Sequence, residues 1–257
     1  MSLLVEEKVV EPHFKISPAL GEAAKQEKAA PPPEAYRFER KFFISDLMRQ
    51  EILALVKLHP AMFSEIYHER SINNIYFDTP TLQYFYATVD GLGRRKKCRI
   101  RWYGDLLGHI AKPVLELKIK EGFVGRKESY ALTPFALDEN FQFGTANEVF
   151  KNSALPAKLK MELFSVQPTL LNRYHRRYFQ SVNRHYRITI DSDLEFYRPK
   201  ARGNTFLHKT LDRNNVIVEL KYSNEKDFHA DSISRHFPFR VTKSSKYVLG
   251  VDMLYFQ

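Results

Sequence analysis

The run KKCRIRWYG at residues 96–104 alternates basic and apolar side chains, and this alternation is the strongest indication of the fold. In a β-strand, successive side chains point to opposite faces of the sheet. One face of the run carries three basic residues and a tyrosine, namely Lys97, Arg99, Arg101 and Tyr103. The opposite face carries Cys98, Ile100 and Trp102. The run therefore predicts a strand with one cationic and one apolar face.

Four further runs divide into a charged and an apolar face in the same way. They are YRFERKFFI (36–44), PVLELKIKEG (113–122), HYRITIDSDLEFY (185–197) and NNVIVELKY (214–222). For any single strand, a solvated outer face explains the charges. Across the set, however, Lys and Arg dominate and recur at i and i+2, where they would repel each other on a narrow face. The set indicates a shared interior that holds a polyanion.

Strand-like patterns also occur at 70–78, 125–133 and 172–181, which makes eight predicted strands in total. Helix-like patterns occur at 44–58, with Ser45 as a plausible N-cap, at 79–90, within 138–164 and at 243–254. The strands and helices do not alternate regularly, so the class is α+β with a mixed or antiparallel sheet. We predict a closed, mainly antiparallel eight-stranded β-barrel that forms a tunnel with a charged interior and helices packed outside.

The distribution of charge sets the expected partner. The chain carries a net charge of +10, and residues 1–34 contain four Lys and six Glu, so residues 35–257 carry +12. Such an excess predicts a polyanionic partner. Residues 1–34 end in KAAPPPE and are expected to be a disordered tail or linker, with one domain at 35–257. A single cysteine excludes an internal disulfide. Without a long apolar run or an N-terminal apolar signal segment, we expect a cytoplasmic protein.

Several strand motifs occur together in an order that resembles a known family. They are RFERKF, NNIYFDT, RIRWYG, LELKIK, YHRRYF, RITIDSDL, VIVELKY and SKYVLGVD. Together, over residues 36–253, they resemble the VTC domain of the triphosphate tunnel metalloenzymes. The resemblance implies an antiparallel barrel tunnel and a polyphosphate polymerase activity that uses ATP and a divalent metal, Mn²⁺ or Mg²⁺. The implied partners are ATP, phosphate and polyphosphate.

The resemblance also assigns roles to individual residues. It implies catalytic roles for Arg99, Arg101, Lys118, Arg176 and Arg187. It implies phosphate binding by Lys41, Tyr174, Lys243, Ser245 and Lys246, and metal binding by Glu219. The related hydrolytic branch begins its first strand with Glu-x-Glu-x-Lys, whereas Arg37 stands at the first of these positions here. This departure argues against hydrolysis and leaves Glu219 to share the metal with phosphate oxygens and water.

Two other functions remain open from the sequence. A phosphohydrolase would use Glu39 and Glu116 on the charged faces. A non-catalytic polyanion-binding module would use the basic run Arg94 to Lys97, although we interpret Arg94 to Lys96 as a solvated turn. We do not expect nucleic acid as the partner, and any membrane partner would be a separate protein.

Overall fold

The computed structural model describes residues 37–122 and 124–256. Within these ranges, nine strands form one antiparallel sheet in the order β1-β11-β9-β8-β2-β3-β5-β6, with β10 added beside β9. Their bounds are β1 (Arg37–Ile44), β2 (Ser64–Asp78), β3 (Arg94–Tyr103), β5 (Val114–Glu121), β6 (Val124–Ala131), β8 (Gln167–Gln180), β9 (Arg187–Tyr197), β10 (Thr210–Asp212) and β11 (Val216–Ser223). A second, two-stranded sheet joins β4 (Gly108–Ile110) to β7 (Phe135–Leu137). The eight predicted strands are all present, and β4, β7 and β10 are additional.

Six α-helices lie in the same ranges. They are α1 (Arg49–Lys57), α2 (Gln83–Val89), α3 (Phe143–Asn152), α4 (Ala157–Leu163), α5 (Asp227–Arg235) and α6 (Lys246–Tyr255). The first helix starts later than predicted, and Ser45 is not its N-cap. Instead, the Glu51 carboxylate accepts a hydrogen bond from the Met48 N–H at 2.6 Å. The predicted helical region 138–164 is two helices, and α5 was not predicted.

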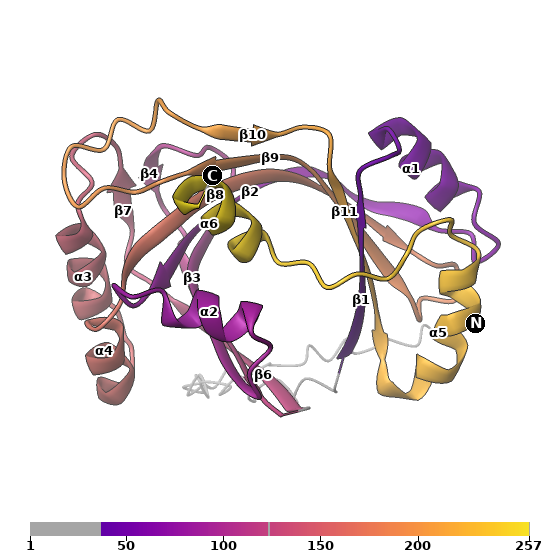
Figure 1. The fold of residues 1–257 in the computed structure, drawn as a ribbon, viewed down its shortest axis with the longest axis horizontal. Helices are drawn as coiled ribbons and strands as arrows, with labels where there is room; N and C mark the ends of the chain where they lie inside the picture. Colours follow the sequence, from indigo (N-terminus) through magenta and orange to yellow (C-terminus); the bar gives the residue numbers. More distant parts are fainter. Residues whose placement is uncertain (1–36, 123, 257) are drawn as a thin grey trace, which may run out of the picture. The chain divides into compact units, whose positions relative to one another are not determined.

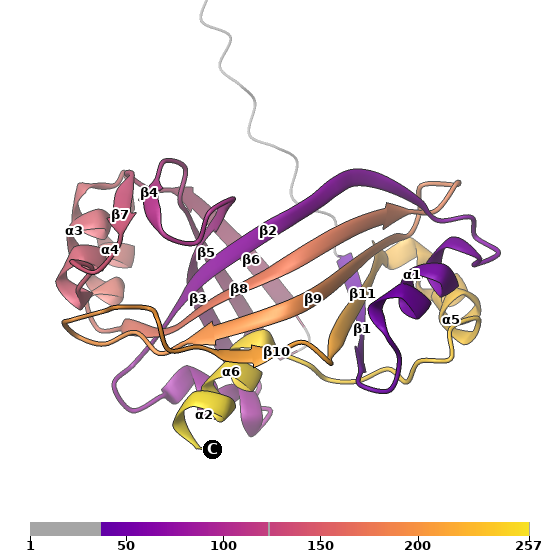
Figure 2. The ribbon, with the colours of Figure 1, turned by 90° about the horizontal axis from the view of Figure 1, so that it is seen from above.

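The sheet is strongly curved. Figures 1 and 2 show the long strands β2, β8 and β9 crossing the domain, with β3, β5 and β6 on one side and β1 and β11 on the other. The two sides face each other, because Lys118 Nζ on β5 lies 3.4 Å from the Glu39 carboxylate on β1. However, β1 and β6 end the strand order and do not pair within the described residues. The predicted α+β class is confirmed, whereas barrel closure through backbone pairing is not.

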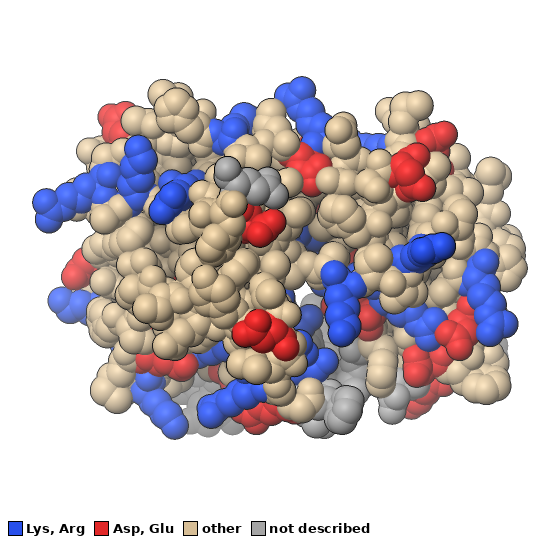
Figure 3. Space-filling view, viewed as in Figure 1, with Lys and Arg blue, Asp and Glu red and all other residues tan. Residues whose placement is uncertain are grey.

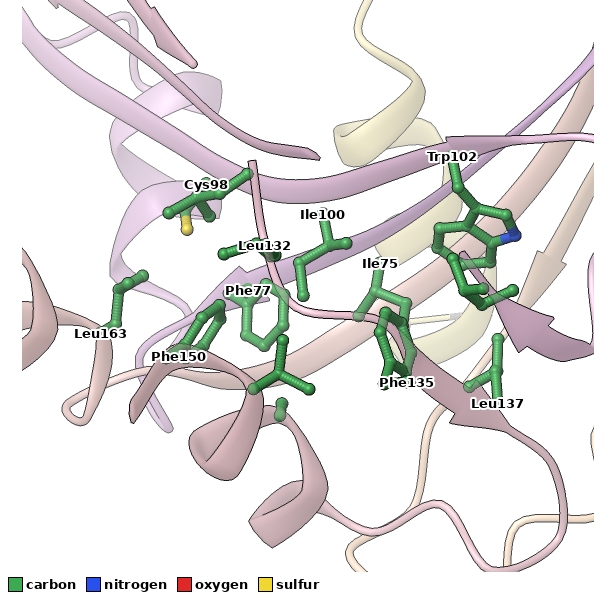
Figure 4. Packing of buried hydrophobic residues seen from close by; sticks show 14 of the residues in the cluster. Ile75, Phe77, Cys98, Ile100, Trp102, Leu132, Phe135, Leu137, Phe150 and Leu163 are labelled. Carbon is green, nitrogen blue, oxygen red and sulfur yellow. The ribbon is translucent and has the colours of Figure 1, made fainter. Parts of the chain in front are cut away.

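Apolar clusters cover the outer, convex side of the sheet. On the convex side, Ile75, Ile100 and Leu117 of β2, β3 and β5 pack against α3 and α4. Figure 4 shows part of this cluster, including Ile75 and Ile100. Cys98 is buried in the same cluster, in agreement with its predicted place on the apolar face of the run. A second cluster joins β1, β9 and β11 to α1 and α5 and includes Phe42 and Val218.

One helix corrects the prediction that helices pack only outside. Tyr247 and Val251 of α6 are buried with Tyr174 of β8 and Ile217 of β11, on the side of the sheet that carries the charged residues. Lys246, the first residue of α6, reaches the Asp191 carboxylate on β9. We call this side of the sheet the concave face. The helix α6 therefore covers part of it and adds polar side chains to it.

Candidate functional site

The concave face gathers nine basic side chains around four carboxylates. The bases are Lys41, Lys97, Arg99, Arg101, Lys118, Lys127, Arg176, Lys221 and Lys246, and the acids are Glu39, Glu116, Asp191 and Glu219. They come from β1, β3, β5, β6, β8, β9, β11 and α6. Figure 3 shows an opening near the centre of one side of the domain, with Lys and Arg side chains around it. The face is thus charged, solvent-accessible and strongly cationic.

Glu116 on β5 holds the basic side chains of β3 and β6. Its Oε2 atom accepts two hydrogen bonds from Arg99, at 2.8 and 2.6 Å, and lies 3.6 Å from Arg101 Nη1. Its Oε1 atom lies 2.8 Å from Lys127 Nζ. Burial alone would raise the pKa of Glu116, but Arg99, Arg101 and Lys127 together lower it to about 2. Glu116 is therefore ionised and fixes three cations in place.

Arg101 is held from three directions, which orients its guanidinium group. Its Nε donates to Asn74 Oδ1 at 2.9 Å, and its Nη2 donates to the Tyr174 hydroxyl at 3.2 Å. Asn74 in turn donates to Asn172 Oδ1 at 2.9 Å. Burial would raise the pKa of Tyr174, but the cations Arg176 and Arg101 lower it. The buried amide and hydroxyl network positions Arg101 before any ligand binds.

A second group centres on two buried carboxylates, Asp191 and Glu219. Arg176 binds Asp191 in a bidentate manner, at 2.5 and 2.6 Å, and lies 3.4 Å from Glu219. Lys246 contacts Asp191 and lies 4.0 Å from Glu219. Burial would raise the pKa of Glu219, but Lys221, Lys41 and the other cations hold it well below its usual range. Both acids are ionised and bound to several cations at once.

Glu219 connects this group to β1. Its carboxylate lies 3.2 Å from Lys41 Nζ and 2.7 Å from Lys221 Nζ, and it accepts a hydrogen bond from Thr189 at 3.3 Å. The register places Lys41 directly opposite Glu219 in the β1–β11 pair. Glu39 lies 3.7 Å from Lys41 and 3.8 Å from Lys221, so it shares both cations. These contacts join β1, β11 and β9 on one side of the curved sheet.

Lys97 differs from the other cations because it has no ion pair within the described residues. Its Nζ donates a hydrogen bond of 2.8 Å to Ser245 Oγ, at the N-cap of α6. Burial lowers the pKa of Lys97, and the cations Lys41, Lys118, Arg99 and Arg95 lower it further, to about 7. Lys97 is therefore the cation on this face that is most easily neutralised.

The structure brings most of the predicted site residues together. Nine of them belong to this network: Lys41, Arg99, Arg101, Lys118, Tyr174, Arg176, Glu219, Ser245 and Lys246. Two lie at its border. Arg187 and Lys243 are exposed and make no ion pair or side-chain hydrogen bond within the part of the chain that the structure describes. The catalytic role of Arg187 and the phosphate contact of Lys243 remain predictions.

Six network residues lay outside the predicted site set: Asp191, Lys97, Lys127, Lys221, and the two glutamates named for the alternative hydrolase, Glu39 and Glu116. Strand alternation carries a signal for them. Lys97 shares a face with Arg99, and Lys221 and Asp191 share faces with Glu219 and Arg187 respectively. Asp191 is fully buried, so it is a structural anchor of the cationic side chains as well as a neighbour of Glu219.

The basic run at the start of β3 is divided between two faces. Arg94 is largely exposed beside Glu121, Lys96 binds Glu162 on the outer side at 2.5 Å, and Lys97 points to the concave face. The interpretation of Arg94 to Lys96 as a turn is wrong, because these residues begin β3 and pair with β5. Divided in this way, the run does not form one continuous basic patch.

The carboxylates suit a metal ion only together with a phosphate ligand. No group of three or more His, Cys, Asp and Glu side chains placed to hold a metal occurs within residues 37–122 and 124–256. Glu219 offers an ionised oxygen donor, but Lys41 and Lys221 already bind it. Mg²⁺ and Mn²⁺ often bind one or two carboxylates plus substrate phosphates and water. Glu219 therefore fits an ion that binds together with its substrate.

The model of the VTC domain family matches residues 36–255. The chain belongs to the VTC domain family. The match spans every helix and strand described above, and it confirms the resemblance seen in the strand motifs. Residues 1–34, predicted to be a tail or linker, lie outside the residues that the structure describes.

Solved structures of distant sequence resemble this VTC domain. A proposed adenylate cyclase from Vibrio parahaemolyticus is 14% identical, with a TM-score of 0.45 over 84% of this chain and 98% of that one. A protein from Pyrococcus horikoshii is 12% identical, with a TM-score of 0.48 over 85% and 99%. A proposed adenylate cyclase from Bacillus halodurans is 11% identical, with a TM-score of 0.48 over 87% and 98%. A comparison with curated proteins finds no match.

None of the helices among the described residues combines the length and the apolar character needed to cross a bilayer.

Proposed function

We propose that this VTC domain transfers the terminal phosphoryl group of ATP to phosphate or to the end of a growing polyphosphate chain. The observation that carries the proposal is the surplus of nine bases over four acids on one curved face. Burying so many like charges without a counter-anion is unfavourable. Phosphate oxygens match this need, because Arg binds them bidentately and Lys acts as a point charge.

The proposed ligand lies along a tunnel formed by the concave face. We infer that the side-chain contact between Lys118 and Glu39 closes the gap between the two ends of the sheet. Arg99 and Arg101 would then exchange part of their contact with Glu116 for phosphate oxygens. Arg176, Lys246 and Lys41 would do the same from the group around Glu219. Preformed ion pairs of this kind hold the cations in position, so binding requires little reordering.

The transfer itself would depend on position and charge. An acceptor phosphate is ionised at neutral pH, so no general base is required, and catalysis of phosphoryl transfer is mainly electrostatic. A Mn²⁺ or Mg²⁺ ion held by Glu219 would neutralise charge on the transferred phosphoryl oxygens. Glu116 is a weak base with a pKa of about 2, which argues against a hydrolytic role in activating water.

Product analysis tests the proposal. Purified protein is incubated with ATP and Mn²⁺, ADP is measured, and polyphosphate is detected on a stained gel. We expect ADP and long chains. Arg99→Ala should lower the rate by about 100-fold or more, since it removes a charge from the reacting phosphates. Arg187→Ala should also reduce turnover, because the family resemblance assigns Arg187 a catalytic role.

Arg126→Ala is the matched control, because Arg126 pairs with Glu128 on the outer side of β6. It should retain wild-type turnover. Free phosphate without long chains would identify the protein as a hydrolase. Binding of ATP and tripolyphosphate without any turnover would identify it as a binding module. Equal losses in Arg99→Ala and Arg126→Ala would contradict the assignment of the concave face.

A further inference from the structure

One end of the concave face is bordered by a stretch of β2 that has a paired strand on one side only among the described residues. The strand β2 pairs with β3 only from Ile72 to Phe77, so its first half pairs only with β8 among the described residues. Tyr103 ends β3 opposite Ile72, at the point where the β2–β3 pairing stops. The beginning of β2, the end of β3 and the end of β8 therefore form one mouth of the concave face.

Three tyrosines and an arginine gather at this mouth. The Arg70 guanidinium lies 4.6 Å from the centre of the Tyr67 ring and 5.6 Å from that of Tyr178. The two rings are 5.6 Å apart and nearly perpendicular, at 89°. Tyr67 is 48% exposed and Tyr103 is 54% exposed, so both rings are open to solvent. Arg70 is exposed and has no carboxylate partner within the described residues.

The mouth continues directly into the cationic groups of the concave face. Arg70 stands opposite Arg176 in the β2–β8 pair. The Arg176 guanidinium lies 6.0 Å from the centre of the Tyr178 ring and 5.4 Å from that of Tyr174. Burial raises the pKa of Tyr178, and the nearby Tyr103 hydroxyl adds to this shift. Neighbouring aromatic rings and guanidinium groups therefore extend from the exposed mouth to the buried Arg176–Asp191 pair.

We propose that Tyr67, Arg70, Tyr103 and Tyr178 bind the nucleobase of a nucleoside triphosphate whose phosphates lie on the concave face. This inference rests on the proposed function. Bases stack on aromatic rings and on planar guanidinium groups, whereas a polyphosphate chain offers no flat apolar surface for them. A ligand with both a base and a triphosphate matches the mouth and the cationic groups together.

The opposite end of the face has a different character. There Lys97, Lys118 and Lys127 stand on β3, β5 and β6, and the register places Lys118 between the other two. These lysines suit phosphate alone. The nucleoside would therefore lie at the tyrosine mouth, and the phosphate chain would extend toward the lysines.

Binding measurements on two ligands test this inference. The affinity of a non-hydrolysable ATP analogue and that of inorganic tripolyphosphate are measured by calorimetry, without turnover. In Tyr103→Leu and Tyr67→Leu, we expect the dissociation constant of the ATP analogue to rise about 5- to 100-fold, the range that base stacking gives. The dissociation constant of tripolyphosphate should change less than about 2-fold. Because stacking tolerates any base, a GTP analogue should behave like the ATP analogue.

The controls separate the ring from the hydroxyl and from general surface effects. Tyr103→Phe keeps the ring and should bind the ATP analogue like wild type. Phe228→Leu removes an aromatic side chain that is 88% exposed on α5, and it should change neither ligand. Unchanged affinity for the ATP analogue in both leucine variants would overturn the inference, as would equal losses for both ligands. Either result would leave the proposed function intact. A wild-type protein that binds neither ligand would overturn both.

Discussion

Lys97 is the residue whose charge depends most directly on its neighbours. The groups that face it are cations: Arg95 and Arg99 on its own strand, Lys41 on β1 and Lys118 on β5. Among the described residues, its side chain makes a hydrogen bond only to the neutral hydroxyl of Ser245, the N-cap of α6. Burial and these cations lower its pKa to about 7. A bound triphosphate would replace repulsion with attraction and raise the pKa again.

This leads to a prediction about proton uptake. At pH 8, Lys97 is largely neutral in the free protein, so binding of the ATP analogue should take up a fraction of a proton approaching one. At pH 6, Lys97 is already protonated and its uptake should disappear. Calorimetry in two buffers of different ionisation enthalpy measures the uptake. Lys97→Met should abolish the difference between the two pH values, whereas Lys96→Met, which loses an outer contact with Glu162, should not.

The lowered pKa of Lys97 also determines whether its contribution to the stability of the fold rises or falls with pH. The pKa of Lys97 in the fold lies below the ordinary lysine value of 10.5, so the unfolded chain binds more protons between pH 7 and 10.5. Its contribution therefore makes the ligand-free fold more stable as the pH rises through this window. A stability curve with the same slope in Lys97→Met would contradict the assignment of this proton to Lys97.

At the residue scale, alternation predicts which side chains share a face but not how they pair. It places Arg99 with Arg101, and Lys41 and Glu219 on charged faces, as found. It leaves Arg176 undecided, since Arg177 is equally basic and points the other way. In the structure, Arg176 points to the concave face, where it binds Asp191 on the neighbouring strand β9. Arg177 points the other way and binds the exposed Glu65. Such partners depend on strand register, which a single strand does not encode.

At the element scale, long alternating strands were predictable and short or covering elements were not. The strands β4, β7 and β10 have three residues each, too few for a pattern. The helix α6 was predicted, but its position on the concave face was not, because its packing depends on one glycine. A Cβ atom at Gly250 would lie 2.5 Å from Phe196 and 2.7 Å from Leu170. Only a residue without a side chain allows this approach.

Gly250→Ala should therefore move α6 or strain the core beneath it. Overpacking of this kind costs about 1–3 kcal/mol of unfolding free energy. Because α6 carries Ser245 and Lys246, binding of tripolyphosphate should weaken as well. Urea denaturation and calorimetry measure the two effects. Gly144→Ala on α3 is the control, since nothing lies within 4 Å of the added Cβ, and it should be neutral or slightly stabilising. Equal free energies of unfolding for Gly250→Ala and Gly144→Ala would contradict this expectation, because α6 would then accommodate the added Cβ atom without cost.

At the scale of the whole domain, composition indicated a polyanionic partner but not where it binds. The net charge of +12 over residues 35–257 could equally be spread over an outer surface. The alternation within each strand predicted which strand faces carry part of this charge. The curvature of the sheet then brings these separate faces together. That curvature depends on twist and on packing of α3, α4 and α5 against the convex side, contacts between segments far apart in the chain. Whether the two sheet ends meet is likewise a property of the whole sheet.

Because the cationic groups stand on both sides of the curved sheet, a ligand that spans them should stabilise the domain. Lys118 and Arg99 approach from one side, and Lys41 approaches from the other. At 100 times its dissociation constant, tripolyphosphate should add about 2.7 kcal/mol. For a domain of this size, that raises the melting temperature by about 5–11 °C. Phosphate at the same ionic strength reaches one side at a time and should add much less.

Lys118→Met tests whether the ligand spans the two sides. It should reduce the rise in melting temperature caused by tripolyphosphate, because β5 loses the cation that reaches the Glu39 carboxylate on β1. Lys151→Met removes an exposed lysine on α3 whose one ion pair within the described residues is with Glu148, so it should leave the shift unchanged. Thermal denaturation at constant ionic strength measures both. If tripolyphosphate shifted the melting temperature no more than phosphate, the ligand would not span the sheet, and the charges of the concave face would act as separate sites.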